Sequence, residues 1–291
     1  MRKGVLALAA GCLTAAAGWH FAARDHFAYR IGRDWKYEMR YIGSQTNADP
    51  VTGTLPSEDG LGFYERRIRV LADGDWPRSV VLDDAYRVVE RGTNKVIFEY
   101  ITRDTVNPKT GMRIGAAAGD FVVFPRNVQK TTYYLSSNYL EHLPVSFEHT
   151  DKVDGIETYV FAYRGPVEYT NAYRGSADYP GVQVGKGQEI RCIDDQFFFR
   201  AWVEPTTGEV AQMEEGCPSA DYIIDVASGK RLSVVDRWDG RSEGNAEMTD
   251  AVRAARSRFL WGTRYVPLCL LAAAVLAAAA GVFPRVKPEA A

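Results

Sequence analysis

Apolar residues are distributed in two different ways along the chain. Residues 4–23 (GVLALAAGCLTAAAGWHFAA) and 265–283 (YVPLCLLAAAVLAAAAGVF) are continuous apolar runs that contain no Asp, Glu, Lys or Arg. Between them, apolar and polar residues alternate. A helix of ~20 residues is ~30 Å long, which matches the hydrocarbon thickness of a bilayer. The pattern therefore predicts a transmembrane helix at each end, over residues 1–25 and 265–283.

The N-terminal run has two further interpretations. It could be a signal peptide cleaved after the small residues Ala15-Ala16-Ala17, or a lipoprotein leader cleaved before Cys12. Its length exceeds the 7–15 apolar residues of a signal peptide, which favours an uncleaved anchor.

Positive charges close to the two runs predict the orientation. Arg2 and Lys3 precede the first run, and Arg285 and Lys287 follow the second. Because Lys and Arg are enriched on the cytoplasmic side, both termini are expected there. The prediction is a two-pass protein of the plasma (inner) membrane with a cytoplasmic tail at 284–291 and its main domain outside the cytoplasm.

The middle of the chain, residues 26–242, is predicted to be a single β-rich domain. Alternation and an excess of β-branched and aromatic residues indicate strands. These strands are expected at residues 36–42, 64–70, 95–103, 121–124, 131–135, 157–164 and 196–204. The apolar spacing then changes to a helical period, which predicts a juxtamembrane helix over residues 243–264.

A turn signal recurs between these strands. The form polar-Pro-x-Thr-Gly occurs at residues 49–53, 107–111 and 204–208, and a version without proline occurs at 226–229. Proline presets one turn position and glycine accepts the left-handed conformation that closes the loop. Repeated hairpins predict a mainly β fold, an antiparallel meander or an open barrel (half-barrel), flanked by transmembrane helices.

Two of the predicted strands are apolar on both faces. One face carries Tyr159, Phe161, Phe197 and Phe199, and the other carries Phe198 and Trp202. A half-exposed antiparallel sheet would be polar on one face. Either a second layer packs there, which is the plainer explanation, or these six residues line an apolar cavity.

Charge and cysteine content narrow the partners and the compartment. Residues 24–262 hold 30 of the 35 Lys and Arg and 36 of the 37 acidic residues, a net charge of −6. Without a basic run, nucleic acid is not an expected partner, whereas the lipid bilayer is. Cys192 and Cys217 are the only cysteines outside the apolar runs. An oxidising compartment makes them a candidate disulfide.

No motif in the chain predicts catalysis, a cofactor or a metal. His142 and His149 have no cysteine or carboxylate cluster beside them, and no Gly-x-Ser-x-Gly motif occurs. The pairs Asp83-Asp84 and Asp194-Asp195 are interpreted as turn residues. We therefore expect a protein that is not an enzyme.

Several segments in order along the chain resemble one family. They are the two apolar ends, Phe98 with Asn107-Pro-Lys-Thr-Gly111, Asp154-Gly-Ile-Glu-Thr-Tyr-Val-Phe161, and Ala201-Trp-Val-Glu-Pro-Thr-Thr-Gly-Glu-Val210. The combination resembles the actinobacterial PorA-like family, whose members are mostly of unknown function. The resemblance implies a location in the cell envelope and assigns no catalytic residue.

Three functions follow as hypotheses. The first is a membrane-anchored domain that binds or carries an apolar or lipidic molecule in the envelope, which the doubly apolar strands favour. The alternatives are a porin-like channel and a non-enzymatic scaffold that binds a protein partner.

Overall fold

The computed structural model describes most of the chain: residues 2–23, 36–47, 60–74, 79–90, 96–115, 119–136, 140, 142–169, 190–218, 221–234, 236–242 and 246–282. The chain divides into two compact units. A helical unit combines Met1–Arg30 with Ala254–Ala291, and a β unit comprises Ile31–Arg253.

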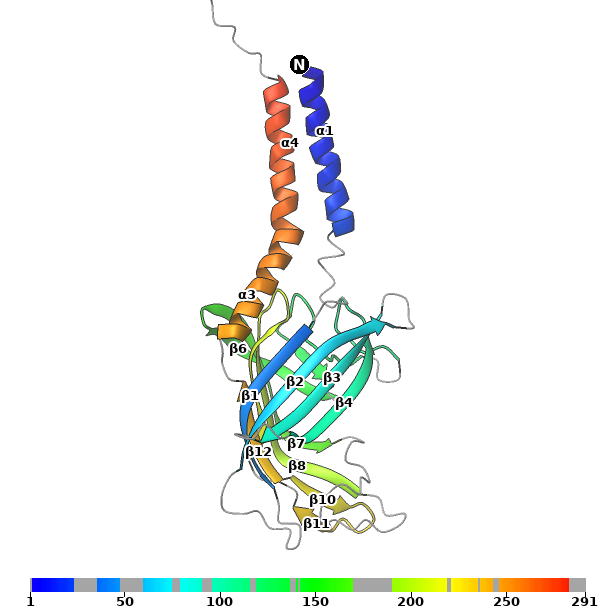
Figure 1. The fold of residues 1–291 in the computed structure, drawn as a ribbon, viewed down its shortest axis with the longest axis vertical. Helices are drawn as coiled ribbons and strands as arrows, with labels where there is room; N and C mark the ends of the chain where they lie inside the picture. Colours follow the sequence, from blue (N-terminus) through cyan, green and yellow to red (C-terminus); the bar gives the residue numbers. More distant parts are fainter. Residues whose placement is uncertain are drawn as a thin grey trace, which may run out of the picture. The chain divides into compact units, whose positions relative to one another are not determined.

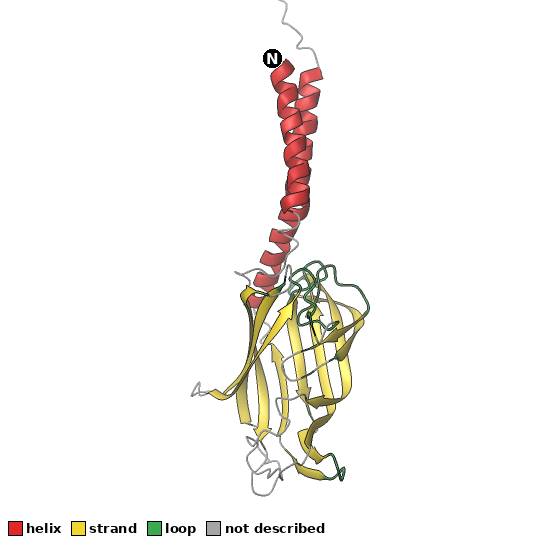
Figure 2. Cartoon of the chain, turned by 90° about the vertical axis from the view of Figure 1, so that its right-hand side faces the viewer, coloured by secondary structure: helices red, strands yellow, loops and turns green. Residues whose placement is uncertain are grey.

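The helical unit is formed by the two ends of the chain. Helix α1 (Arg2–Gly18) continues into a π-helical turn, η1 (Trp19–Ala23), and a second π-helical turn, η2 (Trp261–Tyr265), leads into α4 (Val266–Val282). Helices α1 and α4 lie side by side and antiparallel, so the N-terminus is beside the C-terminal end of α4 (Figures 1 and 2). Both helices consist almost entirely of apolar residues, so neither has a polar face.

The β unit contains one antiparallel sheet. Its strands are β1 (Lys36–Asn47), β2 (Gly60–Asp73), β3 (Val80–Glu90), β4 (Val96–Val106), β5 (Thr132–Leu135), β6 (Leu143–Val153), β7 (Ile156–Tyr169), β8 (Ile190–Val203), β9 (Val210–Cys217), β10 (Asp221–Asp225), β11 (Arg231–Val234) and β12 (Asp236–Ser242). The helix α3 (Ala246–Leu260) follows, in the place of the predicted juxtamembrane helix.

The sheet is curved but is not closed into a barrel (Figure 2). Its strand order is β4-β3-β2-β1-β12-β9-β8-β7-β6-β5, and β10 pairs with β8 and β11 beside this path. Isolated bridges Val106–Arg113, Met112–Phe121 and Phe121–Leu135 link the two terminal strands, β4 and β5, at single positions. The predicted mainly β, antiparallel fold is confirmed.

The predicted strands are correct except for residues 121–124. That run has only an isolated bridge at Phe121 and then bends away from the sheet. The interpretation of Asp83-Asp84 and Asp194-Asp195 as turn residues is wrong, because they lie within β3 and β8. The predicted turn at 49–53 lies outside the described residues.

Three of the predicted turns share one geometry. In each, the amide of the first residue donates to a carbonyl five positions later, and the closing glycine donates back to the first carbonyl. The bonds are Asn107 N to Met112 O with Gly111 N to Asn107 O, Glu204 N to Glu209 O with Gly208 N to Glu204 O, and Asp225 N to Lys230 O with Gly229 N to Asp225 O. The turn prediction is confirmed at these positions.

The buried apolar residues on the inner face fall into two clusters, one in each half of the sheet. The larger contains Phe161, Phe197 and Val203 from β7 and β8, and the smaller contains Ile68, Leu82 and Val106 from β2, β3 and β4. Residues 121–128, which we call the inner segment, contribute to both. Because one segment contacts both halves of a continuous sheet, the sheet must curl around it.

The opposite face of β7 and β8 is covered by the first part of α3. Val252 packs with Val160, Trp202 and Ala211 in a third cluster. Thr249 and Arg253 also hydrogen-bond to Asp154 in the turn between β6 and β7, over 3.1 and 2.5 Å. The doubly apolar strands are therefore covered by protein on both faces, as the packing explanation requires.

Candidate functional site: the inner segment, two turns and Asp120

The inner segment is held by two equivalent turns from opposite halves of the sheet. Val122 N donates to Gly111 O over 3.1 Å, at the turn that follows β4. Asn127 N and Val128 N donate to Thr206 O and Pro205 O over 3.2 and 2.8 Å, at the turn that follows β8. The inner segment thus lies between the turns 107–111 and 204–208.

Glycine at the end of each turn allows this close approach. Gly111 and Gly208 have φ of +75° and +72°. A Cβ atom at Gly208 would lie 2.1 Å from Pro125 O, and one at Gly111 would lie 2.6 Å from Val123 O. Gly229, in the third turn, has a similar φ of +65° but no atom within 4 Å of its Cβ position. Contact with the inner segment therefore distinguishes the first two turns from the third.

Glu204 stabilises the second turn from within the core. Its side chain is fully buried, and Oε2 accepts hydrogen bonds from Thr207 N and Thr207 Oγ1, both over 2.7 Å. A carboxylate that accepts local hydrogen bonds fixes the loop conformation as a cap does at a helix end. The turn is consequently rigid where it contacts the inner segment.

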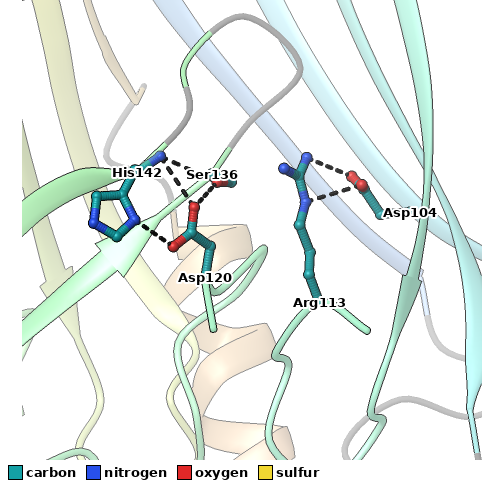
Figure 3. Close-up of polar contacts among 5 residues, drawn as sticks. All are labelled: Asp104, Arg113, Asp120, Ser136 and His142. Carbon is teal, nitrogen blue, oxygen red and sulfur yellow. Dashed lines mark hydrogen bonds and ion pairs between the residues drawn. The ribbon is translucent and has the colours of Figure 1, made fainter. Parts of the chain in front are cut away.

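Asp120 joins the two ends of the loop that carries the inner segment. Its Oδ2 accepts a hydrogen bond from Ser136 Oγ over 2.5 Å and from His142 N over 3.1 Å, and its Oδ1 lies 2.8 Å from His142 Nδ1 (Figure 3). Its side chain is 10% exposed. Because a carboxylate is acceptor-only when ionised, Nδ1 is the protonated nitrogen.

His142 is exposed to solvent although several contacts hold it in place. Its side chain is 68% exposed, and its ring stacks on Tyr134 with centroids 4.2 Å apart. Its φ of +58° is uncommon for a residue other than glycine. This backbone conformation directs both the amide and Nδ1 to Asp120.

The Asp120, Ser136 and His142 arrangement differs from a nucleophilic triad. There, histidine accepts the proton of the serine hydroxyl. Here the Ser136 hydroxyl donates to the carboxylate instead.

Nearby, Arg113 Nε and Nη2 bind the Asp104 carboxylate at 2.9 and 3.0 Å (Figure 3). These contacts fasten the loop.

Five of the six candidate cavity residues belong to the apolar clusters, and Phe198 pairs with Arg164; that the six line a cavity stays a prediction. Phe161, Phe197 and Phe199 belong to the larger inner cluster, with Tyr159 packed against it. Phe124 and Tyr133 contact Phe161 with ring centroids 5.0 and 5.5 Å apart. Trp202 faces α3 on the other side. The inner segment therefore occupies the space beside the inner aromatic row.

The predicted disulfide between Cys192 and Cys217 is wrong. Cys217 is a buried thiol beside Gly216, which pairs with Phe198 of β8, whereas Cys192 pairs with Tyr169 and Ile223. In this register Cys217 lies opposite position 197 of β8. Positions 192 and 197 of one strand are about 16 Å apart. A disulfide requires Cα atoms within about 7 Å. The hairpin at 204–208 separates the two cysteines along the sheet.

Sequence reasoning missed Asp120 and Ser136 and underestimated the two glycines. Asp120 and His142 are 22 positions apart, and Ser136 lies between them. No local pattern indicates their contact. The recurrent Pro-x-Thr-Gly form was a usable signal, but it identified turns and not what the turns contact.

Among the residues that the structure describes, one helix, Met248–Ala280, is long and apolar enough to cross a membrane, and a shorter apolar helix covers Ala7–Phe21. Fold and site together define a β-rich protein with an apolar C-terminal helix and an internal segment clamped by two turns. The chain belongs to the porin PorA family, whose family model matches residues 5–283. This match confirms the predicted resemblance. None of the curated proteins matches the chain.

Proposed function

We propose that this protein is a non-enzymatic, two-pass membrane protein of the cell envelope whose β unit binds or carries an apolar, lipidic molecule outside the cytoplasm. Both termini are on the cytoplasmic side in this proposal, as the positions of Arg2, Lys3, Arg285 and Lys287 favour.

Side-chain size in the helical unit supports the membrane anchor. Among the side chains that the structure describes in this unit, Ala9 and Ala274 are the buried apolar ones, whereas Leu8, Leu13, Leu268, Leu271 and Leu276 are exposed. Helices in lipid associate through small residues and turn large apolar ones outward, because lipid tails are as apolar as leucine. In water, such an outward apolar surface would be costly.

The observation that carries the ligand proposal is the inner face of the β unit. The inward-facing apolar residues of each half, which we call the inner rows, belong to separate clusters, and the inner segment contributes residues to both. The space between the halves is therefore filled by a loop and not by direct packing of one half on the other. An acyl chain would present the same kind of surface to these rows.

Cysteine labelling tests the topology. Ala227→Cys introduces an exposed thiol in the turn between β10 and β11. In intact cells, an impermeant maleimide should label it, whereas Glu289→Cys in the tail should react only after permeabilisation. The wild-type protein measures background from the native cysteines. Labelling of the tail alone in intact cells would reverse the proposed orientation.

Lipid extraction tests the ligand. The full-length protein is moved into nanodiscs of one synthetic phosphatidylcholine and its retained lipids are measured by mass spectrometry. We expect a cellular lipid to survive the exchange in a fixed ratio to protein. A second two-helix membrane protein, treated identically, controls for annular lipid. Recovery of the synthetic lipid alone would contradict the proposal.

A porin-like channel is the second candidate, favoured by two inward carboxylates. Asp84 pairs with Ile68 on the inner row of one half, and Glu215 lies between Met213 and Cys217 on the other. Both carboxylates are buried. If they line a conducting path, the reconstituted protein should raise the conductance of planar bilayers and Glu215→Gln should lower cation selectivity. A silent bilayer would remove this candidate.

A further inference from the structure

The attachment of the inner segment to the rest of the β unit is unusual for a core element. Past Phe121, which bridges to Leu135, the described backbone bonds of residues 122–128 run to turns and not to strands. These bonds are the three to Gly111, Pro205 and Thr206. Apolar contacts run from Val122 and Val123 to one half of the sheet and from Phe124 and Val128 to the other.

The two ends of the same loop are joined by buried polar residues. Asp120 precedes the inner segment and Ser136 follows it, and the two are bonded to each other and to His142. The stretch between these two residues also contains β5, which pairs with β6, so only the part before β5 can move without breaking the sheet. The hydrogen bond between Ser136 and Asp120 is buried, whereas the His142 ring beside it is largely exposed.

We propose that residues 121–128 form a displaceable plug, clamped by the turns 107–111 and 204–208 and latched by Asp120, and that its displacement admits the apolar ligand to the inner rows. This inference rests on the proposed function and adds its gate. When the plug leaves the two turns, its three backbone hydrogen bonds to them break. The ligand then takes the place of the plug as the apolar neighbour of Phe161 and Phe197.

The three turns provide a matched test. Gly208→Ala places a methyl group against Pro125 O, and Gly229→Ala introduces the same change at a similar φ with open space around it. The full-length proteins are reconstituted in vesicles that contain a diazirine-bearing palmitic acid. Hydrogen exchange at Val122 and Val128 reports the plug, and photo-crosslinks within Ile156–Tyr169 and Ile190–Val203 report ligand entry.

We expect Gly208→Ala to accelerate exchange of both amides about tenfold or more, as for loss of one or more hydrogen bonds. Crosslinking to β7 and β8 should rise with it, while exchange within these strands stays unchanged. Gly229→Ala should match the wild type in both measurements. If Gly208→Ala does not fold, Asp120→Asn loosens the latch without adding an atom and should give the same two changes to a smaller degree.

The outcomes separate the gate from the proposed function. If Gly208→Ala accelerates hydrogen exchange at the plug but gives no new crosslinks, the role of the two turns in holding the plug is supported and ligand binding is contradicted. Equal crosslinking of β7 and β8 in the wild type and all variants would support ligand binding and overturn the gate. Equal acceleration in Gly208→Ala and Gly229→Ala would overturn the clamp, because the two differ in contact with the plug.

Discussion

Trp19 donates its indole N–H to the carbonyl oxygen of Gly262 over 2.8 Å, across 243 positions of the chain. Both residues belong to π-helical turns, Trp19 in η1 and Gly262 in η2. A π-helical turn shifts the backbone hydrogen-bond pattern. A partly buried carbonyl without a partner is costly. The indole thus supplies a partner to this carbonyl and fixes the register of the two ends of the chain.

Removing this indole should weaken the pairing of the two helices. Trp19→Phe keeps an aromatic ring and loses the donor, and we expect a cost of about 1 kcal/mol, typical of interhelical hydrogen bonds in membranes. Energy transfer between labels on the termini, followed during denaturation in detergent, measures it. Trp261→Phe, at an exposed site in the same π-helical turn as Gly262, is the matched control. Equal losses in the two variants would show that ring size matters and not the hydrogen bond.

The buried and exposed versions of the turn should differ in what their carboxylates contribute. Glu204→Ala leaves two donors of Thr207 without their acceptor inside the core, which should destabilise the β unit by about 3 kcal/mol. Asp225→Ala removes the corresponding bonds to Ala227 N and Ser228 Oγ at an exposed turn, so we expect about 0.5–1 kcal/mol. Chemical unfolding of both variants measures the difference. Similar losses of unfolding free energy in the two variants would mean that burial does not determine how strongly these carboxylates stabilise their turns.

Local pattern predicted the turns and the strands β1, β2, β4, β5, β7 and β8, because each depends on neighbouring residues, but it missed β3, β6 and β9 to β12. The strand pairing that joins the two halves of the sheet could not be predicted this way. Strand β12 inserts between β1 and β9, and its partners Tyr41 and Cys217 are far apart in sequence. Strand β3 escaped notice because Asp83 and Asp84 interrupt its apolar character. In the structure Asp83 pairs with Arg69 at 2.8 Å while Asp84 is on the opposite face.

The inner segment shows where the pattern misleads. Phe121-Val-Val-Phe124 is an apolar run of strand-forming residues, and sequence alone gives no reason to remove it from the sheet. Its residues are apolar on successive positions because the segment contacts two halves of the sheet at once. That requirement arises from the curvature of the whole sheet, which no short window of sequence contains. The latch at Asp120 escapes prediction for the same reason.

Acid should weaken the β unit in part through Asp151. The Trp202 indole donates to Asp151 Oδ2 over 3.0 Å, which, with the Lys152 amide and nearby His149, lowers the pKa of Asp151 below its ordinary value of 3.8. A carboxyl whose pKa is lower in the folded state stabilises the fold above its unfolded pKa. This stabilisation is lost as pH falls through the folded pKa.

Trp202→Phe should therefore raise the pKa of Asp151 toward 3.8 and make the unfolding midpoint depend less on pH below that value. Carboxyl carbon chemical shifts, followed by NMR during an acid titration, measure the pKa directly. His149→Ala removes the smallest of the favourable contributions and should raise the pKa less. An unchanged Asp151 pKa in Trp202→Phe would show that the indole hydrogen bond does not stabilise the carboxylate in solution.

The first turns of α3 should be the part of that helix that stabilises the β unit. Val252 is buried against Trp202 and Val160, so Val252→Ala should cost about 2 kcal/mol in the unfolding of the β unit. Ser257→Ala, at an exposed position in the same helix, should change it little. Hydrogen exchange at residues 249–253 should rise in the first variant only, because the bonds to Asp154 loosen with the lost packing. Equal stability of the two variants would mean that α3 only covers the sheet, and that Trp202 is held by Asp151 and its own strand.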